Sequence, residues 1–333
     1  MRGDKQKLID LLTGKKVAYI ATKNADYIRI SQEASLVRTY ADKALIITSD
    51  KKKYSGRIFD VYKKILLTDF KEYDIVFVGF MSQMILPWFN WKFHRAQIIE
   101  DFFISIYDTL TDDRKKFSPC SLPGKLIHWI DQRALKAADI IISDTNVHGR
   151  YFKDEFGITG KEFLTLYLEA DHSIYYPRQA EKPDQWKDKF LVLYFGSILP
   201  VQGVDIVLDA IRRLSDQPEI HFLMIGPIED KYDKPETGNV TYIDWLSQED
   251  LAQYIAFSDL CLAGHFSNTV GKANRTIPGK VYIYEAMGKP MILGDSLANR
   301  EKCCNNVFLY STLGSSKELA NNIKRLNSLR KVG

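Results

Sequence analysis

Short apolar runs alternate along this chain with segments whose apolar positions recur every three or four residues. The runs are three to six residues long and rich in Val, Ile, Leu and Phe, which is typical of strands covered by helices on both faces. The expected strands are Val17–Thr22, Ala44–Thr48, Ile75–Phe80, Gln97–Phe102, Ile140–Ser143, Phe163–Leu168, Phe190–Phe195, Phe222–Ile225, Leu260–Ala263 and Met291–Leu293.

The segments between these runs have helical periodicity and recognisable helix ends. The expected helices are Ser31–Tyr40, Arg57–Thr68, Gly124–Ala138, Val204–Ser215, Gln248–Phe257, Lys280–Met287 and Ser316–Arg330. This alternation predicts an α/β fold made of two Rossmann-like parallel-sheet domains. Ligands of such sheets bind at the carboxyl ends of the strands, so we expect the two domains to face a cleft that holds the site.

The alternation of expected strands and helices is interrupted at His172–Lys189, where prolines and several charged side chains indicate a linker. A chain of 333 residues also exceeds what one hydrophobic core usually organises. The expected division is an N-terminal domain at 1–175, a linker at 176–189, a C-terminal domain at 190–315 and a closing helix at 316–333.

Composition indicates a globular protein of the cytoplasm. Hydrophobic residues make up 45% of the chain, but no apolar run reaches the ~20 residues needed to span a bilayer. The first ten residues, MRGDKQKLID, do not have the pattern of a signal peptide. The four cysteines show neither metal-ligand spacing nor a disulfide framework, which suits a reducing compartment. They are Cys120, Cys261, Cys303 and Cys304.

Charge and aromatic residues add one question about a membrane. Residues 1–64 hold 15 Lys and Arg against 7 Asp and Glu, which indicates either a solvated basic face or affinity for anionic lipid. No nucleic-acid-binding module is recognisable, so we expect no nucleic-acid partner. The segment MILPWFNWKFHRAQ, residues 84–97, mixes four aromatic residues with Lys92, His94 and Arg95. It is interpreted as a helix with an aromatic face packed on the sheet, or as a shallow contact with the inner face of the membrane.

Residues 264–296 carry the strongest chemical signal. Lys272, Arg275 and Lys280 lie within nine residues and precede a short helix framed by Pro278 and Gly288. Each cation at a helix N-terminus opposes the helix dipole by roughly 0.3–1 kcal/mol unless an anion lies between them. A diphosphate is the expected anion, and a solvated basic loop is the alternative.

The order of segments in the second half points to a family. LVLYFGSILPVQGVDIVLDAI is followed by FLMIG, YIDWLSQEDLAQYIAFSDLCL and IPGKVYIYEAMGKP, without a GxGxxG or Walker sequence. Over residues 190–300 this order resembles the nucleotide-sugar-binding half of GT-B glycosyltransferases, specifically family 4. In the first half, DFFISIYDTLTDDR and ADIIISDTNVHGRYF resemble acceptor-domain segments of some bacterial members. The resemblance implies an acceptor-binding N-terminal domain and a donor-binding C-terminal domain.

Departures from the family pattern change the expected diphosphate site. The family commonly has Arg just after the first glycine and Lys a few residues on, where this chain has Ser197 and Gln202. The two family glutamates would fall at Arg275 and Ile283. We therefore expect the diphosphate to bind to Gly196, Lys272, Arg275 and Lys280.

The nucleoside and the sugar have weaker candidates. Trp245 lies where the family binds the base and is expected to stack on it, with a place in the core as the alternative. Glu285 is the nearest carboxylate to the second glutamate place, and it is either a ribose ligand or an ordinary helix-surface residue. His265 opens the loop toward the donor sugar and is expected to bond a phosphate or sugar oxygen.

Two aspartates are candidates for the acceptor side. Asp101 ends the run QIIED at the carboxyl end of a strand, where it either bonds the acceptor hydroxyl or the donor sugar as a weak base, or caps the next segment. Asp108 is the second candidate, with an ion pair to Arg114 as the structural alternative. Asp144, in the sequence SDT, is expected to cap a helix that begins near Val147.

These features predict a glycosyltransferase of the hexosyltransferase type, acting in bacterial glycan biosynthesis on a glycan or lipid-linked acceptor. Cations and backbone N–H groups would stabilise the departing diphosphate, so Lys280 and Arg275 are expected to be catalytic and no metal or other cofactor is expected. The family resemblance implies retention of anomeric configuration. Alternatives are a GT-B-fold nucleotide-sugar 2-epimerase and a catalytically silent nucleotide-sugar-binding partner.

Overall fold

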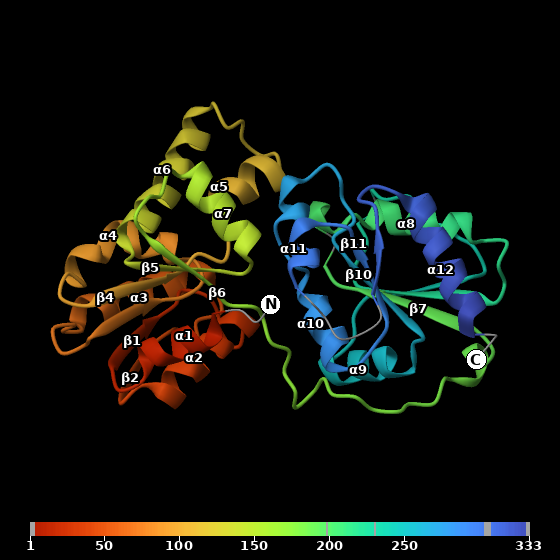
Figure 1. Ribbon diagram of the computed structural model, residues 1–333, viewed down its shortest axis with the longest axis horizontal. Helices are drawn as coiled ribbons and strands as arrows, with labels where there is room; N and C mark the ends of the chain where they lie inside the picture. The colour runs from red at the N-terminus through yellow and green to blue at the C-terminus, as the bar shows by residue number, and fades with distance from the viewer. Residues whose placement is uncertain (1–3, 198, 230, 303–307, 331–333) are drawn as a thin grey trace. The chain divides into compact units, whose positions relative to one another are not determined.

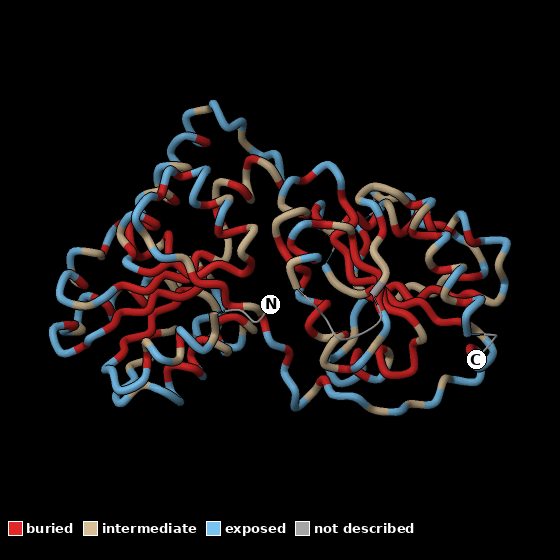
Figure 2. The backbone as a smooth tube through the Cα atoms, viewed as in Figure 1, coloured by how far each residue is buried: buried red, intermediate tan, exposed pale blue. Residues whose placement is uncertain are grey.

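The computed structural model describes residues 4–197, 199–229, 231–302 and 308–330, and the chain divides into two compact units, one up to Glu169 and one from Ala170. Each unit contains one six-stranded parallel sheet with helices on its faces (Figure 1). The predicted α/β class with two Rossmann-like parallel-sheet domains is therefore confirmed. Figure 2 shows the buried strands at the centre of each unit and the exposed positions on the helices and loops around them.

The first sheet has the order β2-β1-β3-β4-β5-β6, with every neighbouring pair parallel. Its strands are β1 (Lys16–Ile20), β2 (Lys43–Ile47), β3 (Ile75–Val78), β4 (Gln97–Asp101), β5 (Ile140–Ser143) and β6 (Glu162–Thr165). Its helices are α1 (Lys5–Leu12), α2 (Ile28–Tyr40), α3 (Tyr54–Leu67), α4 (Leu86–Phe89), α5 (Ile106–Asp108), α6 (Leu122–Ala137) and α7 (Asn146–Glu155).

Side chains alternate between the two faces of this sheet. On one face, residues such as Val76 and Ile141 pack with α3, α4, α6 and α7. On the other face, Tyr19 and Phe77 pack with α1 and α2. Helices cover both faces, as the continuous apolar runs in the sequence require.

The second sheet has the order β12-β11-β10-β7-β8-β9. Its strands are β7 (Phe190–Phe195), β8 (Ile220–Ile225), β9 (Val240–Ile243), β10 (Leu260–Gly264), β11 (Met291–Gly294) and β12 (Phe308–Ser311). Its helices are α8 (Val204–Arg213), α9 (Gln248–Phe257), α10 (Gly279–Ala286), α11 (Leu297–Glu301) and α12 (Ser316–Arg330). Helices α8 and α12 share one core cluster, while α9 contacts β7 and α10 contacts β10.

The sequence did not predict β9 and β12, the two edge strands of the second sheet. The β9 segment VTYI is half-buried throughout, so it has neither the continuous apolar run of a central strand nor a clear alternation. The ten strands that were predicted are all present, each with ends within about three residues of the expected ones.

The aromatic segment 84–97 does not form the single helix that the packed interpretation assumed. It contains the four-residue helix α4 and then a 3₁₀ turn at Asn90–Lys92. Phe89 and Phe93 are buried in the core of the first unit, whereas Trp88 and Trp91 are 48% and 62% exposed. The packed interpretation is correct for the two phenylalanines and wrong for the two tryptophans. No helix within the described residues has both the length and the apolarity to cross a membrane.

Candidate functional site

Three glycines at the carboxyl edge of the second sheet bring backbone segments into close approach. Gly196 follows β7, Gly226 follows β8 and Gly264 ends β10, and all three have positive φ angles. A Cβ atom at Gly226 would lie 2.4 Å from the carbonyl oxygen of Gly196, so a side chain there would displace the neighbouring loop. The carboxyl edge of a parallel sheet is where such folds bind ligands, and Gly196 lies there as predicted.

Lys280 reaches this edge from the N-terminal turn of α10. Its Nζ atom lies 3.8 Å from the ring centroid of Tyr194, and a Cβ at Gly196 would lie 3.6 Å from it. The residue is only 6% exposed, and its Nζ has no hydrogen-bond partner among the described residues. Burial lowers the pKa of Lys280 to about 7. A buried ammonium without an anionic partner is unfavourable, so this position gains most from an incoming anion.

A second polar atom without a partner converges on the same place. The Oε1 atom of Gln202 is buried and has no hydrogen-bond partner among the residues that the structure describes. It lies 3.0 Å from the position that a Cβ at Gly264 would occupy, and the Nζ of Lys280 lies 4.0 Å from that position. An amide has both donor and acceptor atoms, so Gln202 and Lys280 together offer hydrogen bonds to an oxygen-rich ligand.

His265 follows Gly264 and is held as a neutral imidazole. Burial lowers its pKa to about 3, and the positive charges of Lys280 and Lys272 act in the same direction. Its Nδ1 lies 3.3 Å from the Oγ1 of Thr276. At physiological pH the imidazole of His265 is therefore neutral. It can form hydrogen bonds but does not act as a cationic acid.

The other two predicted cations lie on the turn before α10. Lys272 belongs to a 3₁₀ turn at Gly271–Asn274, and its carbonyl accepts hydrogen bonds from the N–H of Arg275 at 3.0 Å and of Thr276 at 3.1 Å. Both cationic residues are partly exposed. The structure therefore brings Lys272 close enough to affect His265 electrostatically. The ammonium of Lys280 is buried beside Gly196 and Gly264, and the Nε atom of Arg275 is buried as well.

The two nucleoside candidates have different surroundings. Trp245 lies in the loop between β9 and α9 and is 74% exposed, so its alternative interpretation as a core residue is wrong. An exposed indole is available for stacking. Glu285 is partly buried on α10, and its carboxylate forms an ion pair with Lys302. The role of Glu285 as a ribose ligand stays a prediction. In that role its carboxylate would bind the ribose while it is also paired with Lys302.

In the first unit, the carboxylate of Asp101 is engaged within the core. Asp101 ends β4 as predicted, but it is 1% exposed. Arg29 on α2 donates to its Oδ1 at 2.8 Å and to its Oδ2 at 3.2 Å. Glu33, one turn along α2, pairs with the same guanidinium. These contacts give Asp101 a structural partner, and its proposed action on a substrate stays a prediction.

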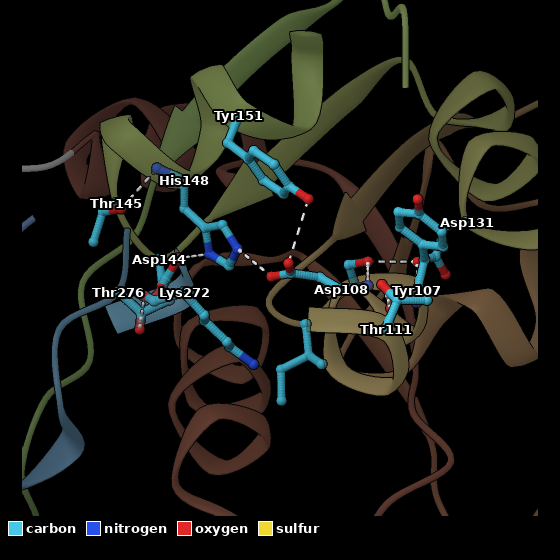
Figure 3. A network of polar contacts seen from close by, with 12 residues as sticks. Tyr107, Asp108, Thr111, Asp131, Asp144, Thr145, His148, Tyr151, Lys272 and Thr276 are labelled. Carbon is cyan, nitrogen blue, oxygen red and sulfur yellow. Dashed lines mark hydrogen bonds and ion pairs between the residues drawn. The ribbon is translucent and has the colours of Figure 1, made fainter. Parts of the chain in front are cut away.

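Asp108 belongs to a polar network that the sequence reasoning did not find (Figure 3). Tyr151 donates to its Oδ1 at 3.3 Å, and the Nε2 of His148 lies 4.0 Å from its Oδ2. The Nδ1 of His148 is 2.7 Å from Asp144, one helical turn earlier. Asp144 is therefore not the cap of α7. The cap is Thr145, whose hydroxyl accepts the N–H of His148 at 2.9 Å.

The spacing of this network was visible in the sequence. Asp144, His148 and Tyr151 are separated by four and three residues, which places them on one side of a helix. What the sequence did not indicate is that α5 brings Asp108 to the same side. The expected alternative for Asp108 was an ion pair with Arg114, but Arg114 is exposed whereas Asp108 is buried.

Within residues 4–197, 199–229, 231–302 and 308–330, no group of three or more His, Cys, Asp or Glu side chains is arranged to hold a metal ion. Cys120 is exposed and Cys261 is buried, and both are free thiols. Cys303 and Cys304 lie outside the described residues.

Known proteins resemble this chain in sequence and in fold. Residues 189–328 match the protein family described as Glycosyl transferases group 1. The chitobiosyldiphosphodolichol beta-mannosyltransferase of Candida albicans is 24% identical over 225 residues, which cover 59% of this chain and 47% of that protein. The chain spans less than half the length of the curated relatives it matches.

Solved structures resemble nearly the whole chain. HepE from Anabaena, solved in complex with UDP, has a TM-score of 0.62 at 14% identity and covers 95% of this chain and 91% of its own. Sucrose-phosphate synthase from Thermosynechococcus elongatus has a TM-score of 0.63 at 12% identity and covers 94% and 90%. The predicted resemblance to GT-B glycosyltransferases is confirmed, and the chain has their fold.

Proposed function

We propose that this chain transfers a sugar from a nucleoside-diphosphate donor to a glycan or a lipid-linked saccharide, as a hexosyltransferase of bacterial polysaccharide biosynthesis. The observation that carries the proposal is the buried Nζ of Lys280, without a hydrogen-bond partner in the described chain, beside Gly196 and Gly264. A diphosphate supplies the negative charge and the acceptor oxygens that this ammonium lacks.

The chemistry of glycosyl transfer fits these groups. As the bond from the anomeric carbon to the diphosphate breaks, negative charge develops on the leaving group. Lys280, Lys272 and Arg275 are proposed to stabilise that charge, together with N–H groups of the loop at Gly196. In this proposal side-chain cations neutralise the diphosphate, and no metal ion takes part.

The rest of the donor is proposed to bind along the same edge. Trp245 stacks on the base, Glu285 accepts bonds from the ribose, and the neutral His265 donates to or accepts from a phosphate or sugar oxygen. The acceptor is assigned to the first unit, with Asp108 and Asp101 as the proposed groups near its hydroxyl. Retention of anomeric configuration is proposed on the family resemblance, with the acceptor attacking from the face that the diphosphate leaves. The proposed location is the cytoplasm, at the inner face of the membrane.

One observation supports an alternative of a different class. The two places where the family carries glutamates hold Arg275 and Ile283, so a catalytically silent nucleotide-sugar-binding protein is the second candidate. A 2-epimerase on the same fold would need acid–base carboxylates around the donor sugar.

The test combines binding with turnover. Thermal shifts with a panel of nucleoside diphosphates identify the base, and the matching nucleotide sugars are then incubated with candidate acceptors and analysed for product. Transfer that Lys280→Ala abolishes supports the proposal. Binding of the sugar nucleotide without transfer to any acceptor, and without epimerisation, would favour the silent partner. Failure of every nucleoside diphosphate to bind would overturn the proposed function.

A further inference from the structure

Exposed apolar side chains are concentrated on one side of the first unit. Among the described residues, 14 large hydrophobic side chains are exposed, and eight of them lie on α3, on α4 with the 3₁₀ turn after it, and on α6. All three elements pack on the same face of the first sheet (Figure 1). The eight residues are Phe59, Leu66, Leu67, Trp88, Trp91, Leu122, Leu126 and Trp129, and we name the surface they form the α3–α4–α6 face.

Hydrogen bonds join these elements into one continuous surface. Arg133 on α6 stacks 5.2 Å from the ring centroid of Trp129 and donates from Nε to the carbonyl of Pro87, next to Trp88, at 3.0 Å. Lys92, next to Trp91, donates to the carbonyl of Leu66 at the end of α3 at 2.7 Å. Trp88 and Trp91 are therefore each next to a residue whose hydrogen bond joins its element to a neighbouring helix.

The face is built from a regular stripe and not from scattered residues. On α6, Leu122, Leu126 and Trp129 recur at intervals of four and three and so lie on one side of the helix. The buried residues of α6, including Ala134 and Leu135, pack into the core instead. Helix α6 consequently has an apolar side directed to the sheet and a second apolar stripe exposed to solvent.

The charges carried by these elements are mostly positive. The cations of the three elements are Arg57, Lys63, Lys64, Lys92, Lys125, Arg133 and Lys136. Against them stand Asp60, which is paired with Lys64, and Asp131, which is fully buried. Several of the cations are lysines, and lysine is depleted at protein–protein interfaces. Tryptophan beside lysine and arginine is instead the composition of surfaces that rest at the headgroup level of a bilayer.

We propose that the α3–α4–α6 face binds the surface of an anionic lipid bilayer. The tryptophans and leucines enter the interfacial region, and the surrounding lysines and arginines pair with acidic headgroups, each contributing on the order of 1 kcal/mol. The proposal deepens the lipid-linked acceptor of the proposed function by giving the membrane contact a location that extends well beyond residues 84–97. Binding to lipid needs no donor or turnover, so failure of this proposal leaves the proposed glycosyl transfer standing.

The test measures binding of the full chain to vesicles without any nucleotide. Co-sedimentation with phosphatidylglycerol–phosphatidylcholine vesicles is compared with pure phosphatidylcholine vesicles at low and at physiological salt. We expect binding to the acidic vesicles that weakens as salt rises, because screening shortens to ~8 Å at physiological ionic strength. Leu122→Ser with Leu126→Ser is expected to raise the lipid concentration at half-binding by about tenfold. Leu126 is 57% exposed, so the melting temperature should remain that of the wild type.

A matched control lies in the second unit. Leu329 is 60% exposed on α12, and Leu329→Ser should leave vesicle binding unchanged. Equal loss of binding in this control, or wild-type binding by the α6 double variant, would overturn the assignment. So would the absence of vesicle binding, or a dimer in solution that the α6 substitutions dissociate, because a second copy of the chain would then cover the face.

Discussion

Arg29 and Asp101 form a fully buried ion pair in which one guanidinium donates to both oxygens of one carboxylate. The pair joins α2 to the carboxyl end of β4. A bidentate pair in a low-dielectric interior fixes the orientation of both side chains. Breaking it by removing one partner leaves an uncompensated charge in the core.

The first prediction concerns this pair. Arg29→Met should lower the free energy of unfolding of the first unit by about 3–5 kcal/mol, because Asp101 and Glu33 lose their cation. Urea denaturation measures the change, and Arg38→Met, at an exposed position of the same helix, is the control. For Asp101→Asn the structural role predicts a lower melting temperature, whereas a purely catalytic role predicts lost turnover at unchanged stability.

The second prediction concerns the pH dependence of stability. Burial raises the pKa of Glu100 from 4.5 to about 8, so the folded state holds a proton that the unfolded state releases between these values. Stability should therefore fall with rising pH across that window, by up to ~1.4 kcal/mol per pH unit. Burial of Asp131, whose pKa is raised to about 7, acts in the same direction. Calorimetric scans should show a flatter pH profile for Glu100→Gln, and an unchanged slope would contradict the assignment.

The third prediction links donor binding to a proton. Burial holds the pKa of Lys280 at about 7 without ligand, and a bound diphosphate should raise it. Above pH 7 the site must take up a proton to bind, so affinity for the nucleoside diphosphate should fall about tenfold per pH unit. Titration calorimetry in buffers of different ionisation enthalpy measures the uptake.

Two variants separate this linkage from a general effect of charge. Lys280→Ala should bind weakly, with no proton uptake and no loss of melting temperature. Lys234→Ala removes an exposed lysine of the same unit and should behave as the wild type. Persisting proton uptake in Lys280→Ala would assign the titration to another group.

The fourth prediction concerns the base. Trp245 is exposed, so Trp245→Ala should leave the melting temperature unchanged. If its indole stacks on the base, the affinity for the nucleoside diphosphate should fall by ~1–3 kcal/mol. A thermal melt measures the stability and a fluorescence titration measures the affinity, with Trp91→Ala in the other unit as the control. Wild-type affinity in Trp245→Ala would show that the base binds elsewhere.

The fifth prediction concerns metals. Because the diphosphate charge is proposed to be neutralised by Lys272, Arg275 and Lys280, donor binding and turnover should persist in excess EDTA. Activity assays before and after chelation test this directly. A complete loss that magnesium or manganese restores would refute it.

Local signals predicted the helix that carries Lys280 in detail. Pro278 and Gly288 framed it in the sequence, and α10 occupies Gly279–Ala286. Gly288 has a φ of 66°, its N–H bonds the carbonyl of Glu285, and the N–H of Lys289 bonds that of Tyr284. This is the Schellman arrangement that a glycine after a helix favours. Such features depend only on neighbouring residues, so one sequence suffices to find them.

The burial of Lys280 could not be predicted in the same way. It depends on the ring of Tyr194 and on the loops at Gly196 and Gly264, which are distant in the sequence. The role of Asp101 failed to emerge for the same reason. The sequence places Asp101 correctly at the end of β4. Its partner Arg29, however, lies on α2, which is separated from β4 in the chain by β2, α3 and β3. Partners that only the tertiary fold brings together decide whether a charged residue is free for a ligand.

Helix α12 has a consequence for how the chain acquires its donor site during synthesis. Leu319, Ala320 and Ile323 lie in the same core cluster as α8 and β7, the first helix and strand of the second unit. The ribosome synthesises these three residues well after Gly196, Gly226 and Gly264, the glycines at the carboxyl edge of the second sheet. Domains fold as units once their core can close, so the nascent second unit should remain open to chaperones until residue 323 leaves the exit tunnel. The described core clusters of the first unit contain no residue after Leu166, so this unit should be compact while the donor site is still being translated.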